Sequence, residues 1–143
     1  MSAVLPRTLR IGELARLAGT TPRTVRYYEE IGLLAAAEER GAGEHRTYTH
    51  ADLERLNEIL RLKSLLGLSL DELRDVMAGE DARAARRAAW QATEDPAERR
   101  RMLAEARAHV ESLLAHVSRH KADVEAYEAE LLERLEKIRA AWS

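Results

Sequence analysis

The stretch TTPRTVRYYEEIGLL, at positions 20–34, decides the fold of the N-terminal part of the chain. Thr21 is a favoured N-cap residue, Pro22 suits the first helical position, and Gly32 can end the helix in a left-handed turn. Two arginines and two tyrosines in so short a helix can hydrogen-bond to phosphates and base edges. The pattern predicts that residues 22–31 form the second helix of a helix-turn-helix, which favours a DNA reader over an enzyme core.

The residues on either side of this stretch complete the unit. Upstream, residues 9–11 are expected to form a short strand, and Gly12 to cap a first helix over residues 13–18, whose apolar residues have helical spacing. Downstream, residues 35–45 are a charged loop that contains glycine, and residues 46–48 alternate like a short strand. The loop and the strand together predict a wing beside the helix-turn-helix.

A third helix is expected to open at Thr49 and to run to about Leu65. Asp52 lies three residues after Thr49, which gives a capping box with aspartate in place of glutamate or glutamine. Apolar residues with helical spacing are expected to form the core of the N-terminal part: Leu14, Leu17, Val25, Ile31, Leu33, Leu53, Leu56 and Leu73.

A fourth helix is predicted over residues 70–77. Ser69 and Glu72 form a full capping box at its start, and Gly79 is expected to close it. A domain boundary near residue 80 follows from this interpretation.

The remainder of the chain predicts a long helix with a coiled-coil pattern. Residues 81–92 are expected to be helical, and Asp95 with Pro96 gives a strong start signal for a final helix that runs to about Ala141. Apolar residues in this helix recur every seven positions, and four others fill the alternate core positions. The first set is Leu103, Val110, Val117, Val124, Leu131 and Ile138, and the second is Ala106, Leu113, His120 and Tyr127.

So long an apolar stripe needs a partner, and a second copy of the chain is the economical choice. The predicted fold is therefore mainly α, with a winged helix-turn-helix domain at residues 1–79, a linker helix at residues 80–95 and a dimerisation helix at residues 96–143. The residues expected to carry dimerisation are Leu103, Val110, Leu113, Val117, Val124 and Leu131.

Composition supports a helical protein that binds DNA with modest non-specific affinity. The net charge is −2, but residues 1–28 hold five arginines against a single glutamate, so a basic face is expected. The chain has no cysteine, which excludes disulfides and thiolate metal sites. No apolar run reaches the length of about 18 residues that predicts a membrane helix. The start of the chain lacks the apolar core of a signal peptide, so a cytoplasmic location is expected.

The order of these elements resembles the MerR family of bacterial transcription regulators. The matching residues are IGELARLAGTTPRTVRYYEEIGLL at 11–34, HRTYTHADLERL at 45–56 and LGLSLDEL at 66–73. The resemblance implies dimers that pair through an antiparallel coiled coil and bind pseudo-palindromic operators, often in promoters with an over-long spacer. It further implies that the dimer bends and untwists this DNA so that RNA polymerase engages both promoter elements, or that it represses.

The resemblance and the residue chemistry together select candidate DNA contacts. They are Thr21, Arg23, Thr24, Arg26, Tyr27, Tyr28, Arg46 and Tyr48. Arg26 is the first candidate, and its alternative role is an ion pair with Glu29 or Glu30. Adjacent helical residues point about 100° apart, so one of the two helix tyrosines is expected to contact DNA and the other to pack, with Tyr27 on the DNA side.

The alternative role of Tyr48 is packing against the third helix. Near the end of that helix, Arg61 and Lys63 are further candidates for the DNA backbone, or else solvated charges.

Three histidines and two tryptophans are the remaining residues of interest. His116 and His120 have the spacing of two metal ligands on one helix face, with His109 one heptad before, but a register-setting role is favoured and no metal or cofactor is expected. Trp90 and Trp142 are expected in interface packing, with an effector pocket as the alternative.

The predicted function is a dimeric, sequence-specific transcription regulator that bends promoter DNA. Its partners would be double-stranded DNA, a second copy, RNA polymerase indirectly and an unidentified small-molecule effector, with no membrane. The competing hypothesis is a protein-interaction module in which the coiled coil is primary. An enzyme is not expected, because the chain has no phosphate-binding glycine loop and no nucleophile motif.

Overall fold

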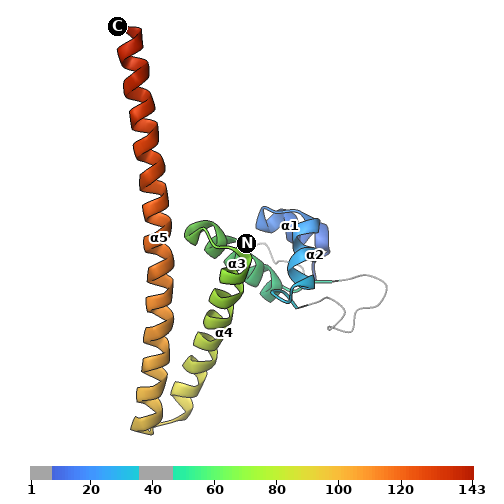
Figure 1. Cartoon of the computed structure of the whole chain (residues 1–143). Helices are drawn as coiled ribbons and strands as arrows, with labels where there is room; N and C mark the ends of the chain where they lie inside the picture. The colour runs from blue at the N-terminus through green and yellow to red at the C-terminus, as the bar shows by residue number, and fades with distance from the viewer. Residues whose placement is uncertain (1–7, 36–46) are drawn as a thin grey trace, which may run out of the picture. The chain divides into compact units, whose positions relative to one another are not determined.

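The computed structural model describes residues 8–35 and 47–143, and five helices occupy most of them (Figure 1). The helices are α1 (Ile11–Ala18), α2 (Pro22–Glu30), α3 (His50–Leu66), α4 (Leu70–Ala92) and α5 (Pro96–Trp142). The mainly α architecture with an N-terminal helix-turn-helix and a long final helix is confirmed. Among the described helices, none combines the length and the apolarity that crossing a bilayer requires.

The chain divides into two compact units, the first ending at Ser64 and the second beginning at Leu65. The division lies within the last turn of α3. Each unit has its own buried apolar residues.

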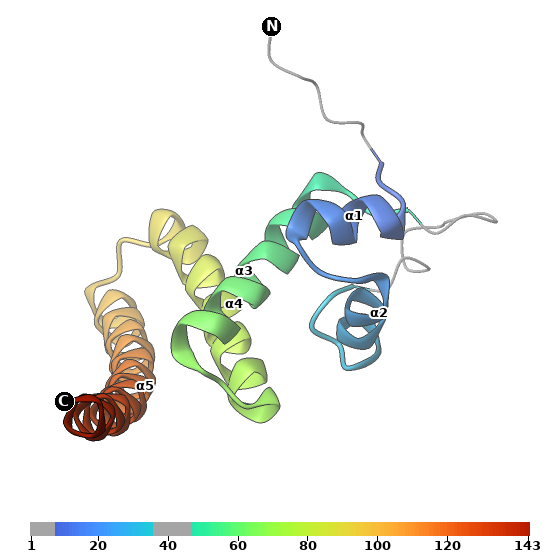
Figure 2. The same cartoon turned by 90° about the horizontal axis from the view of Figure 1, so that it is seen from above.

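In the first unit, α1 packs against α2 through a tight turn (Figures 1 and 2). Gly19 has φ 72°, a left-handed conformation that glycine adopts without a steric penalty. Its N–H donates to the Arg16 carbonyl at 3.2 Å, and the Thr20 N–H donates to the Ala15 carbonyl at 2.8 Å. These bonds end α1 and direct the chain into α2.

Three predictions about the first unit need correction. The first helix begins at Ile11, so Gly12 lies inside it, and only Leu9 makes a strand-like bridge, to Tyr48. Leu17 is 46% exposed and is not a core residue. Ile31 is half-buried and caps α2 instead of belonging to it.

Both predicted capping boxes are confirmed. The Thr49 N–H donates to Asp52 Oδ2 at 2.7 Å, and the Asp52 N–H donates to Thr49 Oγ1 at 3.3 Å. At the start of α4, the Ser69 N–H donates to Glu72 Oε1 at 2.9 Å, and the Glu72 N–H donates to Ser69 Oγ at 3.3 Å. Each box satisfies helix N–H groups that would otherwise lack a partner.

The predicted end of the fourth helix at Gly79 is wrong, because α4 continues to Ala92. The alanine-rich residues 81–92 have high helix propensity and extend the helix without interruption. Gly79 has a packing role instead, since a Cβ at this position would overlap the ring of His109 on α5. A glycine that looks like a helix stop is here a point of close helix contact.

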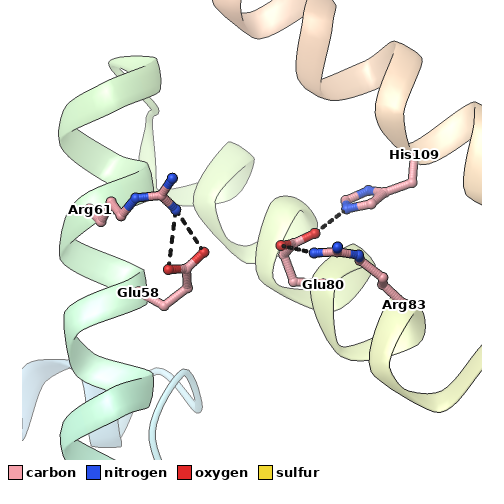
Figure 3. Close-up of polar contacts among 5 residues, drawn as sticks. All are labelled: Glu58, Arg61, Glu80, Arg83 and His109. Atoms are coloured by element: carbon pink, nitrogen blue, oxygen red, sulfur yellow. Dashed lines mark hydrogen bonds and ion pairs between the residues drawn. The ribbon is translucent and has the colours of Figure 1, made fainter. Parts of the chain in front are cut away.

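The second unit is an antiparallel pair formed by α4 and the first part of α5 (Figure 1). Asp95 caps α5 by accepting the Ala97 N–H at 3.2 Å, and Pro96 occupies the first turn, as predicted. Polar contacts then hold the two helices together. His109 Nε2 lies 2.7 Å from Glu80 Oε2 (Figure 3), and Glu72 contacts both His116 and Arg119.

These contacts change the interpretation of the heptad pattern. Five α5 residues line the face toward α4 or are half-buried beside it: Ala106, His109, Leu113, His116 and His120. The alternate core positions that the sequence assigned to a partner are thus partly covered within one chain, up to His120. The main stripe from Leu103 to Ile138 stays accessible, with Val117 at 36% the least exposed of its residues.

The contact between Gly79 and His109 leads to a stability prediction. An alanine in a helix interior is more stable than a glycine by about 1 kcal/mol. We expect Gly79→Ala to show this gain only in a His109→Ala background, because the histidine ring occupies the space of the new methyl group. Urea unfolding of the parent chain, Gly79→Ala, His109→Ala and the double variant measures the coupling free energy between the two substitutions. An equal effect of Gly79→Ala in both backgrounds would contradict the contact.

Glu72 leads to a prediction on pH. Hydrogen bonds from Arg119 and then from Ser69 lower the pKa of Glu72 from its usual 4.5 to about 2. A carboxylate with a lowered folded-state pKa stabilises the fold above pH 4.5, and this contribution is lost as the pH falls from 4.5 towards 2. Glu72→Gln should therefore be less stable than the parent at pH 7, and the difference should shrink over that window.

Denaturant unfolding at several pH values measures this difference. Glu128→Gln on the exposed face of α5 serves as the matched control and should show no such narrowing. A destabilisation by Glu72→Gln that stays constant from pH 7 to pH 2.5 would rule out the carboxylate as its cause.

Candidate nucleic-acid interface

The interface begins at the N-terminus of α2, where the predicted cap is present. The Thr24 N–H donates to Thr21 Oγ1 at 3.2 Å, and the two threonine hydroxyls are hydrogen-bonded at 3.1 Å. Pro22 occupies the first turn. The positive end of the helix is the end where amides and short hydroxyl side chains meet phosphates.

One face of α2 is open to solvent and carries the polar candidates. Four residues at helical spacing line one hollow on this face: Arg23, Arg26, Tyr27 and Glu30. Tyr27 is 44% exposed, and both arginines are exposed. Guanidinium groups can bind guanine or phosphate in a fork, and a glutamate can accept from the cytosine amino group. The face thus presents donors and one acceptor suited to base edges.

The opposite face of α2 is buried and fixes the helix in place. Val25 is fully buried, and Tyr28 is 2% exposed. Tyr28 is therefore the packing member of the tyrosine pair, as expected if Tyr27 is on the open side. Within the described part of the chain the Tyr28 hydroxyl is buried without a hydrogen-bond partner.

Arg26 does not make the ion pair considered as its alternative role. Among the described residues, no contact joins its guanidinium to Glu29 or Glu30. The Glu29 carboxylate is instead engaged by the Tyr48 hydroxyl, which donates to Oε1. The Arg26 side chain is left accessible on the open face of α2.

Tyr48 is buried and joins segments of the first unit. It is 1% exposed, and it exchanges backbone hydrogen bonds of 2.7 and 2.8 Å with Leu9. Together with the bond to Glu29, these contacts join three segments of the first unit. Tyr48 is therefore packed in the first unit through Leu9 and Glu29, and its packing against the third helix stays a prediction. Arg46 and most of the predicted wing loop lie outside the described residues.

The turn after α2 is held by a residue that the sequence did not single out. Gly32 has φ 82°, the predicted left-handed conformation. Arg55 on α3 donates from Nε to the Leu33 carbonyl at 3.0 Å. A basic residue in a helix flanked by buried leucines was the only signal for this role. Glu30 was also missed, although it completes the same helical spacing as Arg23, Arg26 and Tyr27.

The two basic residues near the end of α3 differ in their surroundings. Arg61 Nη1 donates to both carboxylate oxygens of Glu58, at 3.2 and 3.3 Å (Figure 3). Lys63 is exposed.

The histidines and tryptophans of the second unit are separate features. Among the described residues, no group of three metal-ligating side chains is assembled. His109 and His116 contact different glutamates, and a Cβ at Gly67 would overlap the His120 ring. Trp90 is half-buried, and Trp142 is 88% exposed.

Sequence comparison identifies the class of protein to which this helix-turn-helix belongs. The family model described as MerR HTH family regulatory protein matches residues 9–80. The chain belongs to the MerR family, whose members regulate transcription and are not enzymes.

Two curated relatives show how far the similarity extends. The HTH-type transcriptional regulator YfmP of Bacillus subtilis is 36% identical over 97 residues, which cover 68% of this chain and 69% of YfmP. The nodulation protein NolA of Bradyrhizobium elkanii is 47% identical over 81 residues, which cover 55% of this chain but only 36% of NolA. The chain thus corresponds to little more than a third of NolA.

A solved structure shares the fold. HiNmlR, described as a MerR family regulator lacking the sensor domain and bound to promoter DNA, matches with a TM-score of 0.53. The match covers 85% of this chain and 79% of HiNmlR at 22% identity, so the likeness concerns the fold.

The two buried tyrosines give a matched pair of substitutions. A buried hydroxyl without a partner destabilises the fold, whereas a satisfied one contributes about 1 kcal/mol. We expect Tyr28→Phe to be neutral or stabilising and Tyr48→Phe to cost about 1 kcal/mol in thermal or urea unfolding. A larger loss of stability from Tyr28→Phe than from Tyr48→Phe would contradict the assigned roles.

Proposed function

We propose that two copies of this chain bind a pseudo-palindromic operator in a promoter and regulate transcription by bending and untwisting it. Each copy contributes the open face of α2 to the major groove. RNA polymerase then responds to the altered DNA and need not contact this chain. Activation and repression both follow from such a mechanism, depending on the promoter.

The observation that carries the proposal is the division of α2 into two faces. Val25 and Tyr28 anchor the helix, so Arg23, Arg26 and Tyr27 project from a fixed support. Anchoring lowers the entropy lost when these side chains bind DNA. Direct contacts from such a helix specify sequence, while the capped amino end positions the helix on phosphates.

The exposed stripe of α5 supports a dimer. Five apolar residues of α5 are exposed to solvent at a spacing of seven residues: Leu103, Val110, Val117, Val124 and Leu131. Isolated apolar residues on a surface are ordinary, but a continuous stripe of this length marks an interface. Two copies related by two-fold symmetry would read two inverted half-sites. An antiparallel arrangement is the one that the family resemblance implies.

The relatives support DNA as the partner. YfmP is described as a transcriptional regulator, and HiNmlR was solved on promoter DNA. Deforming a site costs on the order of several kcal/mol, which the contacts permitted by the bend offset. Net charge on the whole chain is −2, so binding would depend on local arginines and on two linked half-sites rather than on general attraction.

Arg26→Ala tests the reading face. Loss of a forked contact to a base costs about 1–3 kcal/mol per copy, so affinity should fall by at least about tenfold. The probe is DNA selected by the parent protein from a random-sequence library, and fluorescence anisotropy gives the affinity. Arg100→Ala, an exposed arginine on α5, is the matched control and should bind as the parent does.

The variant must remain a folded dimer for this result to count, which circular dichroism and sedimentation establish. Unchanged affinity of folded, dimeric Arg26→Ala for the selected DNA would refute the assignment of this face.

Val124→Asp tests the dimer. Val124 is 55% exposed and lies beyond the α5 residues that face α4, so the substitution should not disturb the packing within one chain. A carboxylate buried in the seam without a partner is strongly destabilising, so the variant should sediment as a monomer. Ala122→Asp adds the same charge on the outer face of the helix and should remain dimeric. A dimeric Val124→Asp variant would place the interface elsewhere.

A further inference from the structure

The second unit contains a hollow that has no part in the DNA interface. It lies between the last turns of α4 and the first turns of α5, with a volume of about 230 Å³. Arg83, Arg86 and Arg87 line it on the α4 side together with Trp90, and Met102 and Leu103 line it on the α5 side. The volume is slightly below the range of about 300–1,000 Å³ for drug-sized ligands, so an occupant would be small.

The aromatic wall of the hollow is held in position. The Arg99 guanidinium lies over the Trp90 ring, 4.5 Å from its centroid. Arg99 also donates from Nη2 to the Trp90 carbonyl at 3.3 Å and from Nε to the Thr93 carbonyl at 3.0 Å. One arginine thus fixes the indole and the turn between the helices. A ligand would meet a wall that needs no reordering, which reduces the entropic cost of binding.

The charged rim of the hollow is one-sided. Three of its lining residues are arginines, and none is acidic. Arg83 has a partner, since its Nη1 lies 3.7 Å from Glu80 Oε1, and the other oxygen of that carboxylate is next to His109 (Figure 3). Among the described residues, Arg86 and Arg87 contact no carboxylate. Two guanidinium groups are therefore available beside an apolar wall.

We propose that this hollow binds a small organic carboxylate with an apolar body. The carboxylate would take a forked contact from Arg86 or Arg87, for which planar guanidinium is well matched. The apolar body would cover Trp90 and Leu103 and remove their exposed carbon surface from water. Inorganic phosphate carries a negative charge but has no apolar body. An uncharged alkyl compound such as 1-octanol has the apolar body but no charge. This proposal goes beyond the function in DNA binding and does not depend on it.

The position of the hollow would allow a bound ligand to affect dimerisation. Leu103 lines it and is also the first residue of the exposed α5 stripe. A bound carboxylate would therefore touch the edge of the proposed dimer seam. Ligand binding and dimerisation would be linked through shared atoms at this residue.

The test is a fluorescence titration of the whole chain carrying Trp142→Phe, which leaves Trp90 as the only tryptophan. Sodium octanoate is the probe, because it is anionic, apolar and transparent where tryptophan absorbs. We expect a saturable change in Trp90 emission. Affinity for 1-octanol and octylammonium should be about tenfold weaker or worse, since the charge-assisted hydrogen bond is lost. Inorganic phosphate should also bind at least about tenfold more weakly, because it has no apolar body to bury.

Two variants distinguish an effect of the lining charge on octanoate binding from an effect of lost folding. Arg86→Gln with Arg87→Gln keeps the length of both side chains and should weaken octanoate about tenfold while leaving 1-octanol unchanged. Gln91→Glu places a negative charge in the lining and should also weaken octanoate. All three positions are at least partly exposed, so folding is expected to be retained, and circular dichroism checks it.

The proposal is overturned by equal affinity for octanoate and 1-octanol, by no response of Trp90, or by full octanoate binding in the arginine double variant. Octanoate binding in a Val124→Asp monomer but not in the dimer would also overturn it, because a second copy would then be the occupant of the hollow. Each of these results is independent of whether the chain binds DNA, so failure here leaves the function in transcription untouched.

Discussion

The burial of one face of α2 is the constraint on which the DNA interface depends. A helix of nine residues is too short to be stable alone in water, so α2 exists only because its inner face is packed. Val25 and Tyr28 supply that face, and the bond from Tyr48 to Glu29 ties the end of the helix to the neighbouring segment. The outer face of α2 consequently does not contribute to the packing that stabilises the helix. Substitution of its exposed arginines is therefore expected to leave the fold intact.

The long helix α5 satisfies its apolar residues in two different ways. Up to His120 one face lies against α4 and the turn before it, where a Cβ at Gly67 or Gly79 would overlap the ring of His120 or His109. Beyond that point, the described residues of α5 have no neighbour within the chain and are exposed. The same helix is thus half of an intramolecular pair and carries an exposed apolar stripe, which the proposed dimer would cover.

Local signals predicted the parts of the structure that depend on local physics. The caps at Thr21 and Ser69 and the separation of Tyr27 from Tyr28 follow from helix geometry and hydrogen bonding alone. The sequence could not show that Gly79 makes a helix contact, because its partner His109 is distant in the chain. It could not show the bond from Arg55 to the turn after α2 for the same reason. Long-range packing was the missing information in both cases.

Sequencing the DNA fragments that the purified chain selects from a random library tests most directly whether two copies read DNA through α2. Two chains related by a two-fold axis must read two half-sites in opposite orientation. The expected result is an enriched inverted repeat whose half-sites are separated by a fixed spacing. An enriched site without two-fold symmetry, or no enrichment at low salt, would contradict the proposed mode of binding.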